Sequence, residues 1–100
     1  MNNENEIENE RFFELKRIIK RLRAPDGCPW DREQTPESVT KYVVEEAYEL
    51  IEAIREGDQT GACEELGDLF FMLLFVAQMY EERGVFSLAD AMNAAAVKMI

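Results

Sequence analysis

The sequence predicts an all-α fold, built as an antiparallel bundle of about four helices. Its 100 residues have room for one core, and only five glycines and three prolines interrupt them. Apolar residues recur at three- and four-residue spacing, which is typical of amphipathic helices. Residues 69–77 are apolar at nearly every helical angle, which is more apolar surface than one small chain buries. We therefore expect homo-oligomerisation to complete the bundle.

The first ten residues differ in composition from the rest. Residues 1–10 are rich in Asn and Glu and contain no apolar stretch, so they predict a disordered tail that is neither a signal peptide nor an anchor. Residues 11–100 form the predicted helical domain. Within it the apolar spacing predicts a first helix over about residues 8–23. Six of the eleven basic residues lie in this helix, and we interpret them as a solvated face.

All three prolines lie in residues 24–36, which excludes a continuous helix there and predicts a structured loop. The loop carries Trp30, the only tryptophan. A large aromatic side chain in a loop either plugs the core or offers a flat surface to a ligand. From the residues alone, the core position is the favoured one.

Three further helices follow from their start and stop signals. The first is expected from Pro36 to Glu56, with Thr35 as its N-cap and Gly57 after its end. After a short turn, the next is expected to run to about Arg83 and to stop at Gly84. A turn this short predicts that the two helices are antiparallel neighbours. The last helix, residues 88–100, is expected to begin after Ser87 as N-cap.

Composition excludes several classes of function. The net charge of −10 disfavours general nucleic-acid binding, because the phosphate backbone is also negative. The absence of His removes His-based catalytic triads, zinc sites with His ligands and di-iron motifs that need His. No apolar run is long enough to span a membrane, so no membrane partner is expected. Cys28 and Cys63 form no C-x-x-C pair, which fits a reduced, cytoplasmic setting.

Two acidic residues lie on the apolar side of the helix predicted after Pro36. Val39, Leu50 and other apolar residues project within about 40° of Glu46, and Glu49 projects about 60° away. The adjacent Glu45 points toward the polar side. An acid on a buried stripe costs several kcal/mol unless a cation or hydrogen bonds compensate, so Glu46 and Glu49 need an explanation.

The next helix repeats this pattern. Glu65 projects among apolar residues, and Asp68 lies one three-residue step further on the same surface. Facing E-x-x-E and E-x-x-D pairs from antiparallel helices can converge on one hard cation, for which Mg²⁺ or Mn²⁺ is favoured over Zn²⁺. The alternative is that Glu46 and Glu49 pair with basic residues of the first helix or extend to solvent.

Three segments together resemble one known family. They are LRAPDGCPWDREQTPES at residues 22–38, VEEAYELIEAI at residues 44–54 and EELGDLFFMLLF at residues 64–75. The chain resembles the MazG nucleoside triphosphate pyrophosphohydrolases over about residues 12–100. The resemblance implies an all-α dimer or tetramer that hydrolyses an NTP or dNTP to the monophosphate and pyrophosphate with Mg²⁺. It also implies that Glu46, Glu49, Glu65 and Asp68 are the metal ligands.

Other residues are candidates for contacts with the nucleotide. Under this resemblance, Glu45 is the candidate for orienting the attacking water or binding a second ion, and Lys41 for reaching a phosphate oxygen. Trp30 or Tyr42 is expected to stack on a base. Active members can carry a Lys where Tyr42 stands, a departure that bears on phosphate binding by this helix. Relatives also often continue past residue 100, so the chain is expected to be a fragment or the N-terminal half of a longer protein. The alternative function is a non-catalytic dimerisation or nucleotide-binding module.

Overall fold

The computed structural model describes residues 3–100 and contains five helices. Their order is α1 (Glu4–Leu22), α2 (Pro29–Glu33), α3 (Pro36–Arg55), α4 (Gln59–Glu82) and α5 (Leu88–Met99). No strand occurs in residues 3–100, so the predicted all-α fold is confirmed, with one short helix more than expected. The chain divides into two compact units, one ending at Gln34 and the other running from Thr35 to Ile100.

In the first unit, α1 begins earlier than the sequence predicted. Asn3 is its N-cap, and the side-chain Oδ1 of Asn3 accepts a hydrogen bond of 2.9 Å from the backbone N–H of Glu6. Residues 4–10, predicted as part of a disordered tail, therefore form the first turns of the helix. Met1 and Asn2, the rest of that predicted tail, lie outside the described residues.

The segment after α1 is held by arginine side chains. The guanidinium of Arg23 donates to the carbonyl oxygens of Asp31 at 2.6 Å and Gln34 at 3.1 Å, and that of Arg32 donates to the carbonyl oxygen of Pro25 at 2.7 Å. These bonds confirm a structured connection. It contains a helix where the sequence predicted only a loop, because a proline is compatible with the first position of a helix, and α2 begins at Pro29.

The expected position of Trp30 in the core is wrong. The Trp30 side chain is 47% exposed on α2. A helix of five residues has no apolar stripe long enough to carry a large side chain into a core, and no residue of α2 is buried.

In the second unit, local signals fix the ends of α3. The side chains and backbone N–H groups of Thr35 and Ser38 exchange hydrogen bonds of 2.8 and 3.1 Å in a capping box, which confirms Thr35 as the N-cap. Gly57, directly after the C-cap residue Glu56, has a φ of 72° and so closes the helix in the left-handed region. Asp58 then caps α4 by accepting a 2.9 Å bond from the N–H of Gly61.

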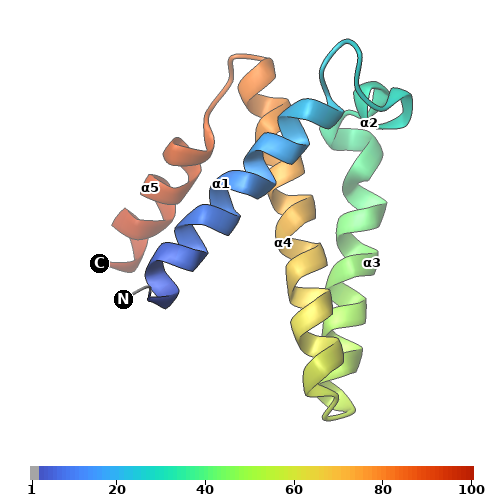
Figure 1. Ribbon diagram of the computed structural model, residues 1–100, viewed down its shortest axis with the longest axis vertical. Helices are drawn as coiled ribbons and strands as arrows, with labels where there is room; N and C mark the ends of the chain where they lie inside the picture. Colours follow the sequence, from blue (N-terminus) through green and yellow to red (C-terminus); the bar gives the residue numbers. More distant parts are fainter. Residues whose placement is uncertain (1–2) are drawn as a thin grey trace. The chain divides into compact units, whose positions relative to one another are not determined.

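Helices α3 and α4 lie side by side and antiparallel, as predicted (Figure 1). Val39 and Ala53 of α3 and Met79 of α4 are buried. Val39 and Ala53 belong to the apolar stripe that the sequence assigned to Glu46, so the predicted helical phase of α3 is confirmed.

A fixed link joins α4 to α5. Gly84 has a φ of 71°, and the N–H of Val85 donates to the carbonyl oxygen of Tyr80 at 3.1 Å. The rings of Tyr80 and Phe86 stack with centroids 4.7 Å apart. Ser87 caps α5 through a capping box with Asp90, as predicted for Ser87. None of the helices in residues 3–100 has the length and apolar character needed to cross a membrane.

Candidate metal centre

Three carboxylates converge between α3 and α4. Glu46 and Glu49 lie three residues apart on α3, and Glu65 lies on α4. One carboxylate oxygen from each lies within 4.8 Å of those from the other two. The antiparallel hairpin thus brings together three of the four acids that the sequence predicted as a cluster.

Two of these carboxylates each have a buried oxygen atom that no donor in the described part of the chain satisfies. Glu46 and Glu65 are half-buried, and their Oε2 atoms are buried without a hydrogen-bond donor among the described residues. Within residues 35–100, no Lys or Arg forms an ion pair with Glu46, Glu49 or Glu65. The sequence also allowed Glu46 and Glu49 to pair with basic residues of α1. Because α1 belongs to the other compact unit, this alternative stays a prediction.

Crowding of negative charge raises the pKa of two of these groups. Burial is the main cause that raises the pKa of Glu46, and the charges of Glu49, Asp68 and Glu45 act in the same direction. The pKa of Glu65 rises to about 7, first because its carboxyl hydrogen-bonds to Glu49 and then because of burial and the neighbouring charges. The site therefore disfavours its own fully ionised form when no cation is bound.

Asp68 lies near this cluster without joining it. It is exposed one turn after Glu65 on α4, and it is not among the three residues whose oxygens converge. Its charge nevertheless raises the pKa of both Glu46 and Glu65. The predicted four-residue set is thus found as three convergent carboxylates and one neighbour.

The donor set suits a hard divalent cation. All the convergent atoms are carboxylate oxygens, the ligands that Mg²⁺ and Mn²⁺ prefer. A cation would coordinate the Oε2 atoms of Glu46 and Glu65, which receive no hydrogen bond from the described residues. The residues therefore fit the metal that the sequence predicted.

The candidate substrate residues are distributed over both units. Lys41 and Glu45 are exposed on α3, and each lies one position before another residue of interest, Tyr42 and Glu46 respectively. The Lys41 Nζ lies 5.1 Å from the centre of the Tyr42 ring, which is a cation–π distance. Trp30 belongs to the other unit.

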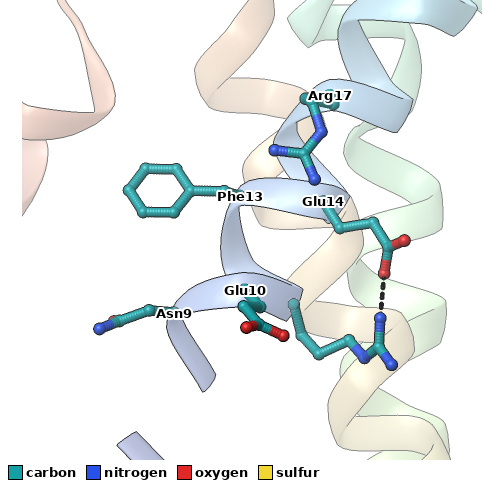
Figure 2. Close-up of a pocket in the computed structure, with 6 residues that line it drawn as sticks. Asn9, Glu10, Phe13, Glu14 and Arg17 are labelled. Carbon is teal, nitrogen blue, oxygen red and sulfur yellow. Dashed lines mark hydrogen bonds and ion pairs between the residues drawn. The ribbon is translucent and has the colours of Figure 1, made fainter. Parts of the chain in front are cut away.

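A separate hollow lies on α1, at residues that no sequence motif singles out. It has a volume of about 470 Å³ and is lined by residues of α1 that include Phe13, Glu14 and Arg17. Figure 2 shows that these side chains all project from one helix. Arg11 and Glu14, which also line the hollow, form an ion pair of 2.7 Å. Because one helix forms all of it, this hollow is a surface depression rather than an enclosed site.

The chain is similar to one family of known proteins and to individual members of it. Residues 34–100 match the MazG nucleotide pyrophosphohydrolase domain. The chain is 47% identical over 89 residues to the nucleoside triphosphate pyrophosphohydrolase/pyrophosphatase MazG of Thermotoga maritima, an alignment that covers 89% of this chain and 35% of the relative. It is 44% identical over 86 residues to the nucleoside triphosphate pyrophosphohydrolase of Escherichia coli K12, covering 85% of this chain and 33% of the relative.

A third relative has no assigned function in its name. The chain is 44% identical over 89 residues to the uncharacterized protein YabN of Bacillus subtilis, covering 89% of this chain and 18% of YabN. The chain spans about a third of the length of the Thermotoga and Escherichia relatives. Because the matched domain takes in α3, α4, α5 and the convergent carboxylates, the chain belongs to the MazG nucleotide pyrophosphohydrolase family.

Proposed function

We propose that the protein hydrolyses nucleoside triphosphates, NTP or dNTP, to the monophosphate and pyrophosphate. The observation that carries this proposal is the convergence of Glu46, Glu49 and Glu65, with two buried oxygens that receive no hydrogen bond from the described residues. The names of the Thermotoga and Escherichia relatives support the same reaction.

The proposed metal is Mg²⁺. The alternative is Mn²⁺, which also prefers carboxylate oxygen ligands. Glu46, Glu49 and Glu65 would hold it, with Asp68 as a fourth ligand from α4. When bound, such a cation neutralises triphosphate oxygens and makes the phosphorus more electrophilic.

The chain's own residues then have separate tasks. Glu45 is exposed beside the cluster, where its carboxylate would orient a water molecule and accept its proton. The water oxygen forms a bond to the α-phosphorus while the bond from that phosphorus to the α–β bridging oxygen breaks, and pyrophosphate leaves. Lys41 supplies a positive charge toward the phosphates, and either Tyr42 or Trp30 supplies an aromatic surface for the base.

The proposal includes a homo-oligomer, a dimer or tetramer, in a cytoplasmic setting. Val44 and Ile54 of α3 and Leu66 of α4 are each more than half exposed, which supports a partner for the hairpin. Both cysteines are free thiols, which is compatible with a reducing compartment.

A second candidate function is a non-catalytic dimerisation or nucleotide-binding module. It is favoured by the position of Lys41, whose ammonium nitrogen lies 5.1 Å from the centre of the Tyr42 ring, where the ring already contacts its charge. The two candidates share the metal site and differ in turnover.

The test is a panel of NTPs and dNTPs incubated with the chain in Mg²⁺ or in EDTA, with pyrophosphate measured separately from orthophosphate. We expect pyrophosphate only with Mg²⁺, and none with Glu49→Gln. Glu52→Gln is the matched control, because Glu52 lies one turn further along α3 in an ion pair with Arg55. Activity retained in Glu49→Gln contradicts the metal site; no pyrophosphate with any nucleotide favours the non-catalytic module.

A further inference from the structure

An apolar groove crosses the α3–α4 hairpin. The groove has a volume of about 440 Å³, and the apolar part of its lining is Pro36, Val43 and Val44 of α3 with Leu73, Val76 and Tyr80 of α4. We call it the docking groove. Val44 is 67% exposed and Leu73 is 48% exposed. Contiguous apolar surface of this kind marks a place where another chain or element packs.

Helix α5 carries an apolar seam that the rest of residues 35–100 leaves uncovered, except at Leu88, which is half-buried. Leu88, Met92, Ala95 and Met99 follow one another at spacings of four, three and four residues, the pattern of a helix that packs against other helices. Every residue from 89 to 100 is exposed. An isolated helix of this length is marginal in water, so α5 needs a packing partner to be stable.

The same chain does not bring α5 into its own docking groove. Residues 83–87 form a fixed link through the positive φ of Gly84 and the hydrogen bond from Val85 to Tyr80. Tyr80 lines the groove and also stacks on Phe86 of the link. With this link in place, Val44 and Leu73 of the groove and Met92 and Met99 of the α5 seam are left exposed.

Charge distinguishes α5 from the rest of its unit. Helix α4 has five acidic residues and no basic one, and α3 has five acidic residues against two basic ones. Helix α5 has one of each, Asp90 and Lys98. A second hairpin approaching the groove would meet like charge, whereas α5 is the neutral helix of this unit.

The geometry points to an exchanged helix: α5 of one copy lies in the docking groove of a second copy, and the second copy's α5 lies in the first groove. Such a contact is isologous and closes as a dimer. It rests on the homo-oligomer proposed above and names the surfaces that make it, and it does not depend on nucleotide hydrolysis.

The experiment is site-specific disulfide cross-linking between full-length chains that lack the natural thiols (Cys28→Ser and Cys63→Ser). One chain carries Met92→Cys and the other carries Val44→Cys, so a link between them joins two copies. Mild oxidation of the mixture is expected to form this link about tenfold faster than in chains that are not held together. Val97→Cys mixed with Val44→Cys is the matched control, because Val97 projects about 180° from Leu88 on α5.

Three results would overturn the exchanged helix. One is a monomer by light scattering at micromolar concentration; another is a link within one chain that carries both Met92→Cys and Val44→Cys. The third is a faster link between two Val44→Cys chains, which would mean that two hairpins pack directly. That third result keeps the homo-oligomer and rejects this contact. As an independent measurement, Met92→Glu is expected to dissociate the dimer and Val97→Glu is not.

Discussion

The two sides of the α3–α4 hairpin differ in the partner that each lacks. One side gathers Glu46, Glu49 and Glu65, whose charges have no counterion in their unit. The other side carries the docking groove, whose apolar lining has no cover. Val44 and Glu49 are five residues apart, which is about 140° on a helix, so the same helix serves both sides.

This difference shows that the chemistry of the residues on each side indicates the kind of partner that would bind there. Carboxylate oxygens without donors favour the binding of a hard cation, since the cation reduces the charge repulsion and coordinates the unsatisfied oxygens. Exposed Val and Leu side chains are stabilised by contact with other apolar groups, which a cation does not supply. We therefore expect changes on the two sides to have separable effects.

The largest effect is expected on the acidic side. Glu65→Gln should lower kcat/KM for nucleotide hydrolysis by about 100-fold or more, because it removes one of three convergent ligands and keeps the side-chain shape. Glu64→Gln is the matched control, since it makes the same change of charge one residue earlier at an exposed position of α4. Both are measured by pyrophosphate release at saturating Mg²⁺. Equal loss in both variants would contradict a specific site at Glu65.

A smaller effect is expected from pH, in the absence of divalent cations. The pKa of Glu65 is about 7 in the folded protein against 4.5 ordinarily, so the folded state keeps a proton that the unfolded state releases between these values. Its contribution to the free energy of unfolding is complete below pH 4.5 and is lost as pH rises through about 7. Thermal unfolding in EDTA at a series of pH values should show this loss in the natural chain and not in Glu65→Gln.

The same proton affects cation binding. Because Glu65 must lose it before acting as a ligand, Mg²⁺ affinity should increase as pH rises toward 7, with proton release on binding. Calorimetric titration in buffers of different ionisation enthalpy measures that release. Binding without proton release at pH 6 would mean that Glu65 is not a ligand.

Local signals in the sequence predicted much of this hairpin. The caps at Thr35 and Ser87 and the left-handed residues Gly57 and Gly84 depend on short-range hydrogen bonds and backbone conformation, which neighbouring residues determine. Helical phase likewise separated Glu46 from its neighbour Glu45, because the phase depends only on the 100° step.

Features that depend on tertiary position were less predictable. Convergence of Glu65 with Glu46 and Glu49, but not of Asp68, depends on the register between α3 and α4, which spacing within one helix does not fix. The docking groove depends on the same register. Trp30 was assigned to a core because aromatic residues usually bury, yet it lies on a helix too short to carry it there.

The smallest effect is expected from Thr35→Ala, at the end of α3 that borders the groove. Loss of the capping box should lower the free energy of unfolding by about 1 kcal/mol and the melting temperature by about 4–8 °C. Pro36 and Thr40 near this cap line the groove, whereas Glu46 lies eleven residues later, about 16 Å along the helix. Dimer dissociation should therefore become easier while Mg²⁺ affinity stays unchanged, and Thr35→Ser should restore both stability and assembly. A fall in Mg²⁺ affinity as large as the fall in stability would instead mean that the hairpin responds as one unit, and that its two sides are not separable.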